Sequence, residues 1–210
     1  MQHNVLYIHG FNSSPLSIKA EQTRRYFAKY FPDVTFHCPQ LKNNPIQALA
    51  QLEVIISQSS EQDGTFIENK TVKTKQRWSL IGSSLGGYFS HYFANKYQLR
   101  AALINPAVKP YELLSDYLGE QTNPYTGEVF HIDQSYVQQL KNIEQLAPKI
   151  DAKEKNNYLV MVQTHDEVLD YQQAVDKFQH CRLVLQQGGD HSFVDFDKML
   201  PTIADFFQLE

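Results

Sequence analysis

Short apolar runs recur along the chain, separated by turns or by segments with helical spacing. An apolar run of roughly four to eight residues between turn signals is typical of a buried strand. Six such runs predict strands, at residues 4–8, 34–38, 78–82, 101–105, 158–163 and 182–186.

Helical patterns fill most of the segments between these runs. Ser14 followed by Pro15 has the form of an N-cap with proline at the first helical position, and Pro32 is expected to end that helix. Asn44 and Pro45 predict a second helix start. The apolar positions of the first helix are Ile18, Phe27, Tyr30 and Phe31, and those of the second, which are expected to lie on one side of it, are Ile46, Leu49, Leu52 and Ile56.

Three further helices are expected, at residues 87–98, at 170–178 with Asp170 as its cap, and near Pro201. Strands that alternate with helices predict an α/β fold, with a mostly parallel sheet of about six strands and helices on both faces. The length of 210 residues fits a single domain, 1–210.

Two segments have no obvious place in that sheet. Residues 107–150 are rich in aromatic and apolar positions, and we expect them to form a short helical cap over the strand ends. Residues 59–76 are polar and predict an insertion or irregular loop. A basic run in and directly after this stretch is expected to be solvated and to lie away from the substrate; its residues are Lys70, Lys73, Lys75 and Arg77.

Charge and composition exclude some classes of function. The formal net charge of −4 and the sequence pI near 6.1 argue against nucleic acid as a partner. No segment has the pattern of a signal peptide or a membrane span, so neither is expected. Cys38 and Cys181 are expected to be free thiols, which suits a cytoplasmic location.

Polar residues that could carry chemistry follow four of the predicted strands. They are His9 with Gly10, Ser84, the run from His165 to Glu167, and the turn from Gly188 to His191. In parallel sheets, ligands bind beyond the carboxyl ends of the strands. The pattern therefore brings these residues to one edge of the sheet.

Ser84 is the centre of a G-x-S-x-G motif that runs from Gly82 to Gly86. Between a strand and a helix, this motif forms a tight turn that holds the serine hydroxyl at the top of the sheet. Ser83 does not fit the spacing, because Ile81 stands where a glycine would be needed. The motif indicates a nucleophilic serine at Ser84.

A serine nucleophile needs a base, and the base needs an orienting acid. Ser84, Asp166 and His191 follow the chain order expected for this fold, with the acid between the serine and the histidine. Glu167 is the adjacent alternative acid, but its side chain is expected to point elsewhere. Asp170 is better explained as a helix cap, and no H-x-x-x-H or C-x-x-C spacing predicts a metal site.

An acyl-transfer site also needs donors for the oxyanion. The backbone N–H of Leu85, at the start of a helix, is one candidate. The backbone N–H of Phe11, in the turn after the first strand, is the other.

Several stretches of the chain resemble the small bacterial YqiA/YcfP-like esterases of the α/β-hydrolase superfamily. They are YIHGFNSSP, IGSSLGGY, NPAVKPYELLSDYLGEQTNPYTGE, DEVLDY and the Gly-Gly-x-His turn at residues 188–191. The resemblance implies an α/β-hydrolase fold, a Ser84–Asp166–His191 triad, esterase activity on acyl esters or thioesters, and a cap that walls an acyl pocket. Two features depart from the family: a longer stretch at residues 63–76, and His165 where glycine is common.

Three functions remain open from the sequence. The first is a carboxylester or thioester hydrolase that acts on a small-molecule substrate through an acyl-enzyme on Ser84, with no cofactor. The second is a non-catalytic binding protein on the same scaffold. The third is an acyltransferase that uses an acceptor other than water. The complete set of three residues disfavours the binding protein.

Overall fold

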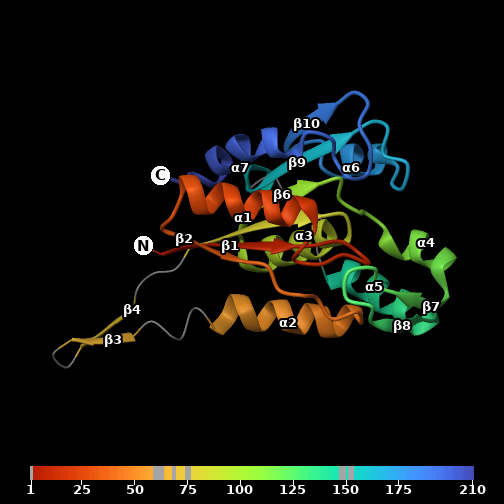
Figure 1. Ribbon diagram of the computed structural model, residues 1–210, viewed down its shortest axis with the longest axis horizontal. Coiled ribbons are helices and arrows are strands. Elements are labelled where there is room, and N and C mark those ends of the chain that lie inside the picture. Colours follow the sequence, from red (N-terminus) through yellow and green to blue (C-terminus); the bar gives the residue numbers. More distant parts are fainter. Residues whose placement is uncertain (1, 59–63, 68–69, 74–76, 147–149, 151–153) are drawn as a thin grey trace.

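The computed structural model describes residues 2–58, 64–67, 70–73, 77–146, 150 and 154–210. Its centre is a parallel sheet in the order β10-β9-β6-β5-β1-β2 (Figure 1). The strands of this sheet are β1 (His3–Ile8), β2 (Val34–His37), β5 (Arg77–Ser83), β6 (Arg100–Ile104), β9 (Tyr158–Gln163) and β10 (Arg182–Gln186). The six predicted strands are thus confirmed, with bounds that shift by one residue at most.

Helices cover both faces of this sheet, as alternating strand positions require. Val5 and Tyr7 of β1 pack on one face with α1 and α7, whereas Leu6 and Ile8 pack on the other face with α2 and α3. Figure 1 shows α1 above β1 and α2 below it. The helices are α1 (Ile18–Tyr30), α2 (Pro45–Gln58), α3 (Leu85–Tyr97), α4 (Pro110–Leu114), α5 (Gln134–Leu146), α6 (Tyr171–Lys177) and α7 (Leu200–Phe207).

The elements from α4 to α5 lie beyond the carboxyl ends of the strands, on the right of Figure 1. They are α4, a 3-10 helix (Ser115–Tyr117), the antiparallel strands β7 (Gly119–Thr122) and β8 (Val129–Ile132), and α5. The side chain of Leu140 in α5 joins the apolar core that α2 and α3 share. The segment therefore packs on the sheet domain. Two further 3-10 helices cover Glu154–Asn157 and Phe196–Met199.

Two expectations about the helices were wrong. The first helix begins at Ile18 with Ser17 at its cap, and the Ser14 hydroxyl instead accepts a hydrogen bond from the Leu16 N–H in the preceding turn. Proline is as suitable for such a turn as for a helix start. The second wrong expectation concerns Ile46, which the sequence pattern places on the apolar side of the second helix. Ile46 is 44 % exposed, because the buried face of α2 is formed by Ala48, Leu52 and Ile56. The caps at Asn44 and Asp170 are confirmed by hydrogen bonds from backbone N–H groups to their side chains.

The polar stretch at 59–76 is not wholly irregular. Residues Gly64–Ile67 (β3) and Lys70–Lys73 (β4) pair as an antiparallel hairpin. Lys70 and Lys73 thus belong to a strand, which corrects the expectation of a loop, and Lys75 lies outside the described residues. The stretch contains several β-branched residues and a phenylalanine, which favour strands despite the surrounding polar residues.

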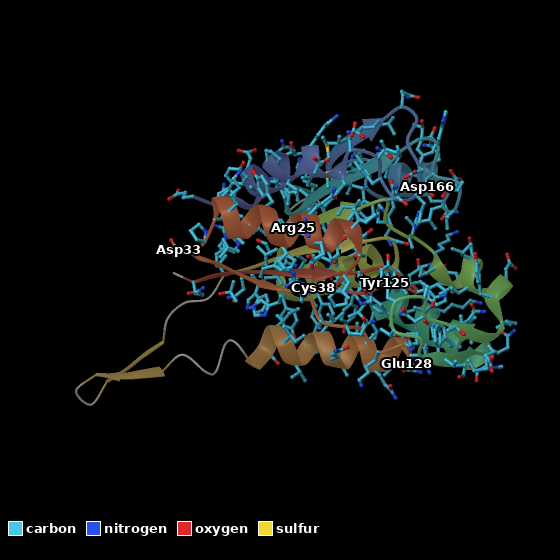
Figure 2. All side chains as sticks on the ribbon, in the orientation of Figure 1. Arg25, Asp33, Cys38, Tyr125, Glu128 and Asp166 are labelled. Carbon is cyan, nitrogen blue, oxygen red and sulfur yellow. The ribbon has the colours of Figure 1, made fainter. Side chains whose placement is uncertain are left out.

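Cys38 follows β2 and Cys181 precedes β10, at opposite edges of the sheet, and both thiols are free. Figure 2 labels Cys38. Among the described residues, no helix is both long enough and apolar enough to cross a membrane.

Candidate active site

Ser84 occupies the turn between β5 and α3, with a φ of 56° and a ψ of −121°. A serine rarely adopts a positive φ, so the surrounding contacts must hold this conformation. The Ser84 N–H donates to the Ile104 carbonyl at 3.0 Å, and the Ser84 carbonyl accepts from the N–H groups of Gly87 and Ala107. These bonds fix the turn from β6, from the segment that follows β6 and from the helix.

Glycine is required on both sides of this serine. A Cβ at Gly86 would lie 1.9 Å from the Ile8 carbonyl oxygen, and one at Gly82 would lie 2.3 Å from the Ser90 hydroxyl. Helix α3 can therefore cross β1 and β5 closely only where these side chains are absent. The close crossing places the helix start directly beneath Ser84.

His191 lies in the loop after β10 and reaches both Ser84 and Asp166. Its Nε2 is 3.1 Å from Ser84 Oγ, and its Nδ1 is 2.9 and 3.0 Å from the two carboxylate oxygens of Asp166. If Nδ1–H donates to the carboxylate, Nε2 is left to accept the serine proton. This is the arrangement that a serine–histidine–acid site needs.

Asp166 is held rigidly in the loop after β9, where Figure 2 labels it. Its side chain is only 1 % exposed, against 22 % for His191. Its Oδ1 accepts backbone N–H bonds from Val168 and Leu169 at 2.9 and 2.8 Å, in addition to the His191 contact. The carboxylate therefore has a fixed position and can in turn fix the imidazole ring.

Glu167 was expected to point away, but its carboxylate also meets His191. Its Oε2 accepts a hydrogen bond from the backbone N–H of His191 at 3.0 Å. That bond lowers the pKa of the Glu167 carboxyl below its usual value. Glu167 thus holds the backbone of the histidine loop, whereas Asp166 holds the imidazole ring. His165, between β9 and these acids, has an exposed side chain.

Two buried amides, which the sequence analysis did not single out, also hold the histidine loop. Asn105 Nδ2 donates to the carbonyls of Asp190 and His191 at 2.9 and 3.3 Å. Gln163 Oε1 accepts from the N–H groups of Asp190 and Val194, at 3.0 and 2.9 Å. Both amides stand at or just after the carboxyl end of a buried strand. That position is the signal that could have identified them.

Phe11 and Leu85, the expected oxyanion donors, both border the space next to Ser84. The N–H of Leu85 belongs to the first turn of α3, where N–H groups have no partner within the helix. His9, at the end of β1, is a structural residue. Its ring spans the Gly10 carbonyl at 2.9 Å and the Leu41 N–H at 3.1 Å. Burial lowers the pKa of the His9 imidazole, which favours its neutral form.

Two cavities meet at Ser84 and His191. One, of about 270 Å³, is lined mainly by apolar side chains of the segment after β6, among them Pro110, Leu113, Leu114 and Tyr117. The other, of about 390 Å³, extends towards α1 and is more polar. No group of three or more His, Cys, Asp or Glu side chains within the described ranges is arranged to hold a metal ion.

Several solved structures share this architecture. Est1E from Butyrivibrio proteoclasticus, with ferulic acid bound, is 12 % identical with a TM-score of 0.67, over 98 % of this chain and 88 % of that one. The mouse α/β hydrolase domain-containing protein 10 is 17 % identical with a TM-score of 0.64, over 98 % and 89 %. The esterase domain of a Rhodothermus marinus protein is 16 % identical with a TM-score of 0.62, over 97 % and 85 %.

These similarities establish the α/β-hydrolase fold that the sequence predicted. A family model described as Uncharacterised protein family (UPF0227) matches residues 4–208. Because that match covers nearly the whole chain, and because the sequence resembles the YqiA/YcfP-like proteins, the protein belongs to the UPF0227 family.

Proposed function

We propose that the protein is a serine hydrolase that cleaves carboxylic ester or thioester bonds of small molecules. The observation that carries the proposal is the hydrogen-bonded series from Ser84 Oγ through the His191 ring to the Asp166 carboxylate. A binding protein has no use for a serine held at a positive φ and aligned with a histidine. Strained backbone at such a position is characteristic of functional sites.

The geometry supports a two-step reaction. In the first step Ser84 Oγ attacks the acyl carbon, while its proton passes to His191 Nε2, 3.1 Å away. The bond from the acyl carbon to oxygen or sulfur then breaks, and the leaving alcohol or thiol takes that proton from His191. In the second step a water molecule, activated in the same way, releases the carboxylic acid and restores the serine.

Asp166 and two backbone N–H groups complete the proposed mechanism. The Asp166 carboxylate keeps the imidazole proton on Nδ1 and stabilises the imidazolium that forms in each step. The N–H groups of Leu85 and Phe11 are the proposed donors to the negative oxygen of the tetrahedral intermediate.

The apolar cavity of about 270 Å³ is the proposed acyl site. It opens at Ser84 and is walled by Leu113 and Leu114 of α4 and by Tyr117, so an acyl chain could lie there without polar partners. Residues 107–150 thereby act as the proposed cap of a single domain. The similar domain from Rhodothermus marinus is described as an esterase, which supports the proposed hydrolase activity.

Steady-state hydrolysis of p-nitrophenyl acyl esters tests the proposal. Ser84→Ala should lower kcat by about 10⁴-fold or more, because the nucleophile is lost. Ser83→Ala is the matched control. Ser83 is a buried neighbour outside the proposed triad, so that variant should keep most of the activity. Loss of hydrolysis in the control together with normal rates in Ser84→Ala would refute the proposal.

A further inference from the structure

The larger cavity at Ser84 has a distinct chemical character. It measures about 390 Å³ and is bordered by the start of α1, by the turn after β1 and by the loop that carries His191. Tyr125, which Figure 2 labels, reaches it from the turn between β7 and β8. The acyl cavity lies under α4 instead, so the two spaces offer separate sites for the two halves of an ester.

Lys19 provides a cation in this cavity. Its Nζ donates one hydrogen bond to the Ser192 carbonyl at 2.8 Å, which leaves two further N–H donors on the ammonium group. Burial lowers the pKa of Lys19 to about 8, although the carboxylates of Asp190 and Asp166 act in the opposite direction. The group therefore stays mostly cationic at neutral pH.

Among the described residues, no carboxylate near this cavity forms an ion pair with Lys19. Asp166 accepts two backbone N–H bonds and a hydrogen bond from the His191 ring. Asp195, which also borders the cavity, forms an ion pair of 2.8 Å with Lys198. Asp190 is the carboxylate that acts most strongly on Lys19, and its buried Oδ1 has no hydrogen-bond partner among the described residues. The ammonium of Lys19 itself bonds the neutral Ser192 carbonyl, so an anion from a ligand would compete with Asp190 for its two remaining N–H donors.

Polar atoms next to Lys19 lack partners. Asn12 Oδ1 and Gln22 Oε1 are buried, and neither has a hydrogen-bond partner among the described residues. Both side chains line the cavity. A buried amide oxygen without a donor is costly, and because it only accepts hydrogen bonds, an N–H or O–H group elsewhere on the leaving group, rather than its anionic group, would remove that cost.

The start of α1 adds positive potential to the same space. The helix has thirteen residues, and its cap residue, Ser17, makes no side-chain hydrogen bond to the first turn. Ser17 and Ile18 border the cavity, so the positive end of the helix dipole lies beside Lys19.

We infer that this cavity binds the leaving group of the substrate, and that the leaving alcohol or thiol carries an anionic group, a carboxylate or a phosphate, which Lys19 recognises. The inference rests on the proposed hydrolase function. It makes Lys19 a specificity residue for one half of the ester and leaves the acyl half to the cavity under α4.

Three acetyl esters that differ in the charge of the leaving group test this inference. They are 4-acetoxybenzoate, 4-acetoxyphenyl phosphate and the neutral 4-acetoxybenzamide. The measured quantity is the ratio of kcat/KM for each anionic ester to kcat/KM for the neutral one. Dividing the ratio of a variant by that of the wild type cancels the intrinsic reactivity of the three esters.

Lys19→Met should lower this ratio by about tenfold or more for at least one anionic ester, because a charge-assisted hydrogen bond is lost. The anionic ester whose ratio falls further shows whether the carboxylate or the phosphate is the preferred anion. Lys19→Arg should keep most of the preference. Lys29→Met, in the last turn of the same helix, removes the same charge far along α1 and should leave both ratios unchanged.

The rate on the neutral ester shows whether Lys19 recognises the anionic group or only supports the loop that carries His191. If Lys19→Met slows all three esters by the same factor, Lys19 only supports the Ser192 carbonyl, and the inference is overturned. It is equally overturned if Lys29→Met changes the ratios as much as Lys19→Met does. If the proposed serine-hydrolase function is itself wrong, the result is different, because Ser84→Ala would then hydrolyse all three esters at the wild-type rate.

Discussion

At the scale of single residues, the candidate site is a set of side chains fixed by backbone groups. Ser84 keeps a positive φ that costs roughly 1–3 kcal/mol in most contexts, and hydrogen bonds from three segments hold it there. Asp166 is held by two N–H groups, and His191 by Asp166 and Glu167. The two neighbouring acids thus have separate tasks, which kinetics can distinguish.

Asp166→Asn should lower kcat for ester hydrolysis by about 10⁴-fold, because an amide can hold the wrong imidazole tautomer. Glu167→Gln should remain within about tenfold of the wild type, since its amide oxygen can still accept the His191 N–H. Rates on one ester, measured for both variants over a range of pH, make the comparison. If Glu167→Gln lost most of its kcat while Asp166→Asn kept a nearly normal kcat, the orienting acid would be Glu167.

The residues that sequence reasoning reached are those with a motif or a chain order. Ser84 stands in a glycine motif, and Asp166 and His191 follow the last two strands in the order expected for the fold. Asn105 and Gln163 stand at the ends of buried strands but belong to no motif or expected chain order. Their role depends on which carbonyl and N–H groups the folded histidine loop presents to them, and that is a property of tertiary structure.

At the scale of elements, the contact between α3 and β1 decides how closely the nucleophile turn can approach the sheet. Gly86 lies against the backbone of Ile8 with no room for a side chain. Strand positions were predictable from the sequence because each apolar run is short and ends at a turn. The start of α1 was not, because the Ser14–Pro15 pair fits a turn as well as a cap.

Gly86→Ala should destabilise the protein by about 3 kcal/mol or more, since the new Cβ would meet the Ile8 carbonyl oxygen at 1.9 Å and backbone cannot move aside cheaply. Gly10→Ala is the milder companion, because its nearest contact would be 3.2 Å, to Ser84 Cβ. Urea denaturation of both variants measures the difference. Equal midpoints for Gly86→Ala and the wild type would show that α3 does not cross β1 this closely.

At the scale of the whole molecule, buried neutral histidines make the free energy of unfolding depend on pH. His91, inside α3, meets the Tyr158 hydroxyl at 3.1 Å and packs against Phe178. Burial, with a smaller effect of Lys177, lowers the pKa of His91 to about 3. Burial and two nearby arginines lower the pKa of His3 to about 4. Both histidines must gain a proton when the protein unfolds in acid.

Between about pH 6.5 and pH 4 the unfolded chain therefore binds more protons than the folded chain, so the free energy of unfolding should fall as pH falls through this range. His91→Gln should reduce the slope of the free energy of unfolding against pH in this range, whatever the variant does to stability at neutral pH. His180→Gln, at an exposed position, is the matched control and should leave the slope unchanged. Urea titrations at several pH values supply the slopes. A wild-type slope in His91→Gln would show that His91 is not kept neutral by burial.

The most direct measurement for the whole account is the site of reaction with a fluorophosphonate probe. The phosphorus of such a probe reacts with a serine hydroxyl that a histidine activates, and no knowledge of the natural substrate is needed. Peptide mass spectrometry should find a single adduct, on Ser84, and neither Ser84→Ala nor acid-unfolded protein should be labelled. An adduct on another serine, or an unlabelled folded wild type that still hydrolyses esters, would contradict the assignment of Ser84 as the nucleophile.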